Sequence, residues 1–86
     1  MEEVTMQNLK EYKSPDFYQS VVLKSAGLTL LRLEKKNDRF FIFVFDDSNN
    51  EAKEIIKSYW SRKLQLVARD LIESINELKT RIHSGV

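Results

Sequence analysis

The spacing of apolar and polar positions changes along the chain and predicts where each element begins. Residues 1–13 carry only scattered apolar side chains, which indicates a flexible N-terminal arm, with a short strand or half-turn as the alternative. Ser14-Pro15-Asp16 is typical of a helix start, because serine caps free N–H groups and proline suits the first helical turn. We therefore predict a helix to about Ala26, closed by Gly27 in a left-handed conformation. Its predicted apolar side consists of Phe17, Val21, Val22 and Ala26, and Ser20 and Lys24 are expected to face away.

Two strands are predicted next, joined by a hairpin turn at residues 35–38. In the first, LTLLRLE at residues 28–34, Leu31 and Leu33 alternate with Arg32 and Glu34, so that Leu28 and Leu30 share a face with Arg32. The second, RFFIFVF at residues 39–45, is apolar on both faces. One face is predicted to carry Phe41, Phe43 and Phe45, and the other Phe40, Ile42 and Val44.

The remaining pattern is helical. Ser48 and Glu51 fit a capping box, and an amphipathic stripe follows, formed by Ala52, Ile55, Ile56, Tyr59 and Trp60. Residues 61–65 contain no glycine, so the pattern leaves open whether the helix bends or stops there. A second helical stripe runs over about residues 66–83 and consists of Val67, Leu71, Ile72, Ile75, Leu78 and Ile82. We therefore predict one α+β domain over residues 14–83, in the order α-β-β-α-α, with a two-stranded antiparallel hairpin packed on three helices and a frayed tail at 84–86.

The doubly apolar strand raises the question of what covers its second face. A two-stranded hairpin is marginal alone, and burying one phenylalanine contributes roughly 1.5–3 kcal/mol. The sequence therefore favours a homodimer that associates through the hairpin, with helices on both faces of one chain as the alternative. The predicted contact residues are Phe41, Phe43 and Phe45, with Tyr59 and Trp60 as further hydrophobic anchors.

Composition narrows the function classes. The chain has 86 residues, a net charge of +1 and no cysteine, which excludes disulfides and thiolate chemistry. No secretory signal or membrane span is apparent, so a soluble cytoplasmic protein without membrane contact is expected. No catalytic motif is present, and no cofactor is expected. Asp46 and Asp47 lack the further ligands of a metal site and are expected to complement a helix start instead, while His83 is expected to be a solvated charge near the C-terminus.

Nucleic acid is the alternative partner that the residues suggest. Lys53, Lys57, Arg62 and Lys63 accompany the Tyr59-Trp60 pair, and such a mixture binds nucleic acids by stacking and phosphate contact. RFFIFVF also matches part of an RNA-recognition motif, but bulky side chains occupy positions that need small ones, and the surrounding strand order is missing.

The chain resembles a family of small uncharacterised proteins of bacteria, phages and mobile elements, known as a domain of unknown function. The shared motifs here are Tyr12-Lys13-Ser14 with Asp16, Phe43 and Phe45 before Asp47-Ser48, Tyr59-Trp60, and Leu78-Lys79 before Ile82-His83. The family tends to carry a glycine-containing turn after the Tyr-Trp pair, where this chain has Ser61-Arg62-Lys63. The resemblance implies a stand-alone module and raises the expectation of an accessory or anti-defence factor, and it implies no activity.

These observations favour a non-enzymatic module that binds a protein partner. A nucleic-acid-binding accessory protein is the second reading. A protein that sequesters a small ligand, or an enzyme, at a dimer interface is the third.

Overall fold

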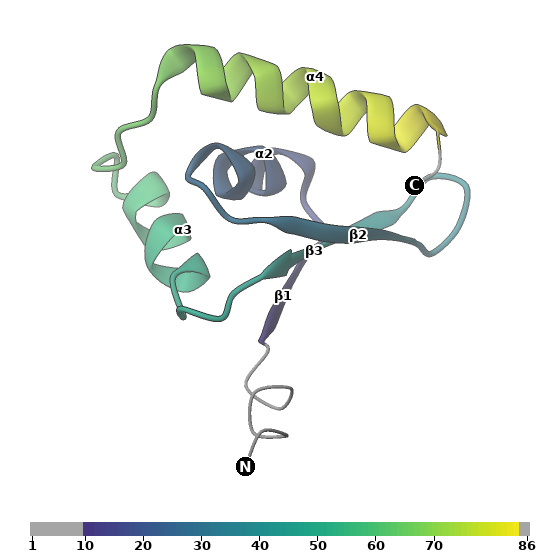
Figure 1. Ribbon diagram of the computed structural model, residues 1–86, viewed down its shortest axis with the longest axis horizontal. Coiled ribbons are helices and arrows are strands. Elements are labelled where there is room, and N and C mark those ends of the chain that lie inside the picture. Colours follow the sequence, from purple (N-terminus) through teal and green to yellow (C-terminus); the bar gives the residue numbers. More distant parts are fainter. Residues whose placement is uncertain (1–9, 85–86) are drawn as a thin grey trace.

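The computed structural model describes residues 10–84, which form a three-stranded sheet and three helices. The elements, in chain order, are β1 Glu11–Ser14, α2 Phe17–Ser25, β2 Leu30–Lys35, β3 Phe41–Asp46, α3 Ala52–Trp60 and α4 Ala68–Ser84 (Figure 1). The sheet is antiparallel with the order β1-β3-β2. The predicted α+β class is confirmed, and the predicted two-stranded sheet is wrong because β1 adds a third strand.

Strand β1 comes from the segment predicted to be an arm. Tyr12 of β1 lies opposite Phe45, and Ser14 lies opposite Phe43. Strand β3 is therefore the central strand of the sheet, with β1 on one side and β2 on the other. Residues 1–9 of the predicted arm, and residues 85 and 86 of the predicted tail, lie outside the described residues. Ser84 of that tail is the last residue of α4.

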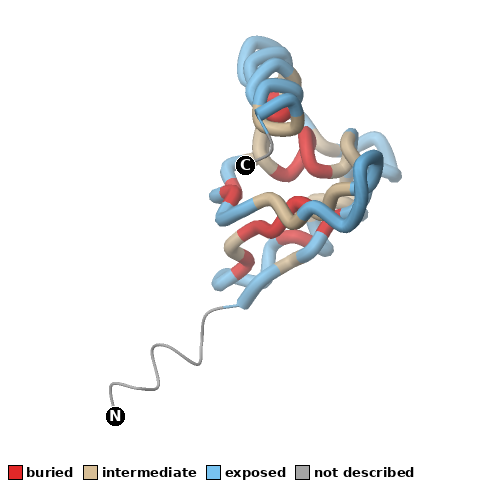
Figure 2. The backbone as a smooth tube through the Cα atoms, turned by 90° about the vertical axis from the view of Figure 1, so that its right-hand side faces the viewer, coloured by how far each residue is buried: buried red, intermediate tan, exposed pale blue. Residues whose placement is uncertain are grey.

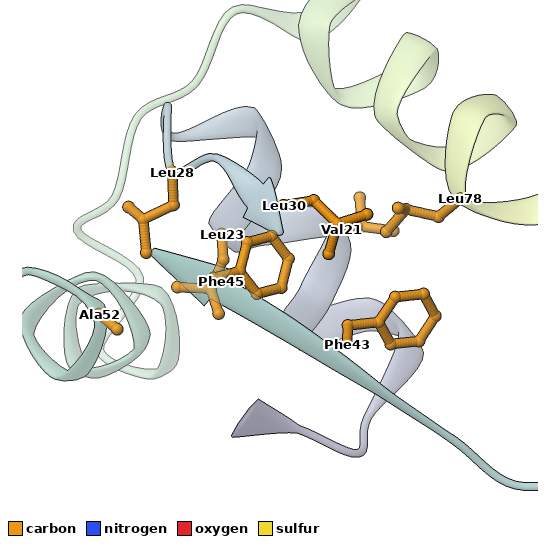
Figure 3. Close-up of a cluster of buried hydrophobic side chains, with 8 residues drawn as sticks. All are labelled: Val21, Leu23, Leu28, Leu30, Phe43, Phe45, Ala52 and Leu78. Carbon is orange, nitrogen blue, oxygen red and sulfur yellow. The ribbon is translucent and has the colours of Figure 1, made fainter. Parts of the chain in front are cut away.

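The helices all lie on one side of the sheet. Helix α2 packs between the sheet and α4, and α3 packs against α2 (Figures 1 and 2). The core that they enclose consists of Val21, Leu23, Leu28, Leu30, Phe43, Phe45, Ala52 and Leu78 (Figure 3). Phe43 is 2% exposed and Phe45 is fully buried, while Phe41 is half-buried against the same cluster. These rings were predicted to contact a partner, and instead they fill the interior of the single chain.

A bulge in β2 changes which leucines face the core. Leu30 lies opposite Phe45 and Arg32 lies opposite Val44, so Leu31 is an extra residue in the ladder. Leu30 and Leu33 therefore both reach the core, and Leu31 is exposed. The strict alternation expected from the sequence, which placed Leu30 beside Arg32, is wrong for this reason.

The start of α2 differs from the prediction by two residues. Asp16 caps the helix, since its carboxylate accepts the Gln19 N–H at 2.9 Å. Ser14 belongs to β1, and its hydroxyl accepts a hydrogen bond from the buried Ser20 hydroxyl at 2.9 Å. Ser20 was expected to face solvent, but it faces the β1–α2 junction because this pairing satisfies it. Gly27 closes the helix with φ +111°, as predicted.

Asp47 starts α3 in place of the expected capping box. Its buried carboxylate accepts the backbone N–H groups of Glu51 and Ala52 at 2.8 and 2.9 Å. The Ser48 hydroxyl donates to Asp46 instead of capping α3. The expectation that these aspartates complement a helix start is confirmed for Asp47.

Helix α3 stops at Trp60 in a Schellman motif built without glycine. Arg62 has φ +65°, its N–H donates to the Tyr59 carbonyl at 3.1 Å, and the Lys63 N–H donates to the Ser58 carbonyl at 2.9 Å. The chain then runs without regular structure to α4. The sequence left open whether the helix bends or stops here. It stops, because Arg62 adopts the left-handed backbone conformation.

We expect Arg62→Gly to stabilise the protein. A left-handed conformation is strained for a residue with a Cβ atom and relaxed for glycine, so the free energy of unfolding should rise by about 0.5–1 kcal/mol. Urea denaturation measures this change. Lys63→Gly is the matched control, because Lys63 has no positive φ; it should leave stability unchanged or lower it. Equal effects of the two substitutions would contradict the strain at Arg62.

Candidate functional site

Charged side chains of β1 and β2 cover the second face of the sheet, and none of the helices within residues 10–84 lies over it (Figure 1). Val44 is fully buried and lies outside the core cluster, between Lys13 of β1 and Arg32 of β2. The Arg32 guanidinium donates to both oxygens of Glu11 at 2.8 and 2.9 Å and also to Glu34 at 3.1 Å. The stems of such side chains can cover apolar surface while their charges stay in water. We call Lys13, Arg32, Glu11 and Glu34 the ion-pair layer. This layer covers the second apolar face of β3.

The ion-pair layer shifts the titration of its members. Hydrogen bonding to Arg32 lowers the pKa of Glu11 and of Glu34, and the same bonds raise the pKa of Arg32. A carboxyl group whose pKa is lower in the folded state stabilises the fold above its unfolded pKa. That contribution disappears as the pH falls through the lowered folded pKa.

We expect the stability of the wild-type protein to fall more steeply with acid than that of Arg32→Gln. Both proteins share every other carboxylate, so the difference isolates Glu11 and Glu34. Thermal unfolding at pH 7 and at a pH well below 4.5, the ordinary glutamate value, measures it. Equal losses in the two proteins would show that the layer contributes nothing to pH dependence.

One side of α3 carries cations and an exposed tryptophan. Lys53, Lys57 and Trp60 are spaced i, i+4 and i+7, so they lie along one side of the helix, and Arg62 and Lys63 follow at its C-terminal turn. All five are exposed. We call these five residues the cationic flank. The structure thus brings together the residues predicted for nucleic-acid binding.

Trp60 was expected on the apolar stripe of α3 but is 67% exposed, and Tyr59 is 37% exposed. Their rings meet edge to face with centroids 5.2 Å apart. Tyr59 contacts the Trp60 ring, while most of the indole surface remains exposed to solvent. Of the five predicted interaction residues, these two therefore stay available at the surface, and Phe43 and Phe45 do not.

The other side of α3 borders an open pocket of about 530 Å³. Glu51, Glu54 and Ser58, spaced i, i+3 and i+7, line it from α3. The walls are largely apolar and come from Ala26, Ile55, Leu64, Leu66 and Val67, and Asp70 of α4 closes the rim. We call this cavity the acidic pocket. Sequence reasoning missed it, although the i, i+3, i+7 spacing opposite the cations was a usable signal.

The charges that have no internal partner gather at these two places. Within residues 10–84, the carboxylates that form neither an ion pair nor a side-chain hydrogen bond are Glu51, Glu54 and Asp70, and all three line the acidic pocket. The lysines and arginines of residues 10–84 that likewise form neither an ion pair nor a side-chain hydrogen bond are Arg39, Lys53, Lys57, Arg62, Lys63 and Lys79. Four of them belong to the cationic flank. Helix α3 therefore separates two opposite, unsatisfied charge sets.

Other candidate chemistry is sparse in the described part of the chain. Residues 10–84 contain no group of histidine and acidic side chains arranged to hold a metal ion. His83 is exposed in the last turn of α4, as the sequence suggested. None of the described helices is long and apolar enough to cross a membrane.

The comparisons with known proteins identify a family and no activity. The family described as Domain of unknown function (DUF5659) matches residues 9–84, which include all the elements described above. No curated protein and no solved structure matches the chain. Because the match spans nearly the whole sequence, this chain belongs to the DUF5659 family.

Proposed function

We propose that this protein is a non-enzymatic binding module that holds single-stranded nucleic acid on the cationic flank. The observation that carries this proposal is the position of Trp60, which is largely exposed among four exposed cations that have no partner within residues 10–84. Base stacking on an aromatic ring contributes about 1–3 kcal/mol per base and does not depend on sequence. Lysine and arginine beside the ring add phosphate contacts, so the flank has both parts of a strand-binding surface.

The structure also favours this ligand over the protein contact that the sequence suggested first. The phenylalanines that would anchor an apolar protein interface are mostly in the core. What remains exposed on α3 is an aromatic pair with cations, which suits a flexible polyanion. The net charge of +1 makes binding depend on this local patch, because the whole molecule has little net field.

The sole tryptophan of the chain is Trp60, so its fluorescence reports on the proposed surface alone. Titration with a single-stranded oligothymidylate should quench this emission. If all four cations contact phosphates, the binding constant should fall about 50-fold between 50 and 200 mM salt. Absence of quenching at low salt would refute the proposal, and quenching without salt dependence would refute the role of the cations.

Two charge-reversal variants provide the matched comparison. Arg62→Glu/Lys63→Glu should weaken binding at least tenfold and reduce its salt dependence, because two phosphate contacts become repulsive. Arg39→Glu/Lys79→Glu makes the same change in net charge at two other unpaired cations, in the β2–β3 turn and in the later part of α4, away from α3 (Figure 1). This control should bind like the wild type. Equal weakening by both variants would indicate a general charge effect.

Stacking is tested separately. Trp60→Ala should weaken the binding of a labelled oligonucleotide about 5–100-fold, and Trp60→Phe should restore part of it. Fluorescence anisotropy of the label measures both variants, which lack the intrinsic reporter. A phenylalanine variant no better than the alanine variant would contradict stacking.

A further inference from the structure

The acidic pocket has the composition of a docking site for a cationic, partly apolar segment. Ile55, Leu64 and Leu66 supply apolar wall, and Val67 is exposed at its rim. Glu51, Glu54 and Asp70 are the carboxylates of the described chain left without an internal partner. Among the described residues, no basic side chain lines the pocket. An occupant therefore gains most if it brings positive charge next to an apolar group.

The chain itself carries a surface with that chemistry. The cationic flank combines four unpaired cations with the largely exposed ring of Trp60. We propose that a second copy of the chain docks here, so that the cationic flank of one copy meets the acidic pocket of the other. This inference goes beyond the proposed function and does not require nucleic acid.

The arrangement of the two surfaces on one helix decides the orientation of the pair. Lys53 and Lys57 lie along one edge of the exposed face of α3, and Glu54, with Glu51 at the N-cap, lies along the other edge. When two helices pair in parallel, opposite sides meet across the seam, as the flanking positions of parallel coiled coils do. In an antiparallel pair, like sides meet and repel. The charge pattern therefore selects parallel α3 helices related by a two-fold axis, in which both charge contacts form twice.

Trp60 gives this contact an apolar centre. Tyr59 lies edge to face against it. Tryptophan and tyrosine are enriched at interface hot spots, where surrounding contacts exclude water. One short helix and a pocket rim form a small interface, which is typical of weak, transient complexes. Association should therefore appear in the upper micromolar range and shift with concentration.

The test pairs two charge-reversal variants in the absence of nucleic acid. Lys53→Glu/Lys57→Glu makes both sides of α3 acidic, and Glu51→Lys/Glu54→Lys makes both sides basic. Sedimentation equilibrium should show each variant alone at the monomer mass of 10.2 kDa up to millimolar concentration. The wild type should rise toward twice that mass. A one-to-one mixture of the two variants should associate about as tightly as the wild type, because each contact again joins an acidic side of α3 to a basic one.

Controls keep the result interpretable. Arg39→Glu/Lys79→Glu should associate like the wild type, and circular dichroism should confirm that every variant is folded. Glu51 stands at the start of α3, where lysine disfavours the helix. If the basic variant does not fold, Glu54→Gln/Asp70→Asn replaces it, and this neutral variant should lower wild-type association at least threefold.

A wild type that stays monomeric at millimolar concentration would overturn the proposal. So would a mixture that remains monomeric while both variants are folded, or association that the neutral variant leaves unchanged. Nucleic-acid binding is measured on the dilute monomer, so its failure leaves this proposal standing, and failure of association leaves the binding proposal standing.

Discussion

Phe45→Ala should lower the free energy of unfolding by about 3–5 kcal/mol, a large share of the total. Phe45 is fully buried on the central strand, opposite Tyr12 of β1 and Leu30 of β2. Its ring belongs to the cluster that joins the sheet to all three described helices (Figure 3). Removing a buried phenylalanine costs about 3–5 kcal/mol, while a domain of this length has only about 4–13 kcal/mol of stability. Urea denaturation followed by far-UV circular dichroism measures the loss.

Phe40→Ala is the matched control, at the residue just before β3. Phe40 is 43% exposed, so its truncation should cost about 1 kcal/mol or less. The sequence alone treats the two residues as members of one Phe-rich hairpin. Similar losses from both substitutions would contradict the burial pattern, and a negligible loss from Phe45→Ala would show that its ring does not hold the elements together.

Leu78→Ala should detach α4 from the rest of the domain. Leu78 is fully buried, and within the described chain it is the one apolar side chain of α4 buried in the core cluster. Truncating a buried leucine costs about 2–5 kcal/mol, because a cavity remains where the side chain was. Helix α4 packs mainly on α2, so the loss should concentrate there. Amide hydrogen exchange should show faster exchange in α4 than in β3 of the variant.

Ile72→Ala tests the opposite side of the same helix. Ile72 was predicted on the buried stripe but is 55% exposed, so its truncation should change stability by less than about 1 kcal/mol. Uniformly faster exchange in both elements of Leu78→Ala would show that α4 and the sheet unfold together. If Ile72→Ala lowered the free energy of unfolding more than Leu78→Ala, the side of α4 that packs on α2 would be the one that carries Ile72, which would contradict the structure.

The helices and the hairpin could be predicted from local signals. Gly27 marks the end of α2, and the spacing of Ile55 and Ile56 gives the buried side of α3. The residue type at each of these positions is required by the conformation or burial there. Such signals act over a few residues and survive without knowledge of the tertiary structure.

The errors concern features that depend on distant contacts. Strand β1 has one apolar residue, Tyr12, and becomes a strand because β3 offers it a partner. Leu31 is displaced by a bulge that no residue type announces. The end of α3, which the sequence left open and did not mispredict, uses a conformation of Arg62 that normally requires glycine. For β1, pairing with β3 outweighs the weak local preference for a strand.

Of the candidate site, the cationic flank could be predicted from the sequence and the acidic pocket could not. The cations and Trp60 are close in sequence, so a list of residues finds them. The acidic pocket joins Ser25 and Ala26, residues 50–58 and residues 64–70, which only the fold brings together. Its carboxylates become notable once the other carboxylates are seen to have partners.

The open position of Trp60 has a practical consequence for spectroscopy. Water already surrounds most of the indole in the native protein, so heating or denaturant will scarcely alter its emission wavelength. A melting curve recorded by tryptophan fluorescence would be nearly flat and could be mistaken for great thermal resistance.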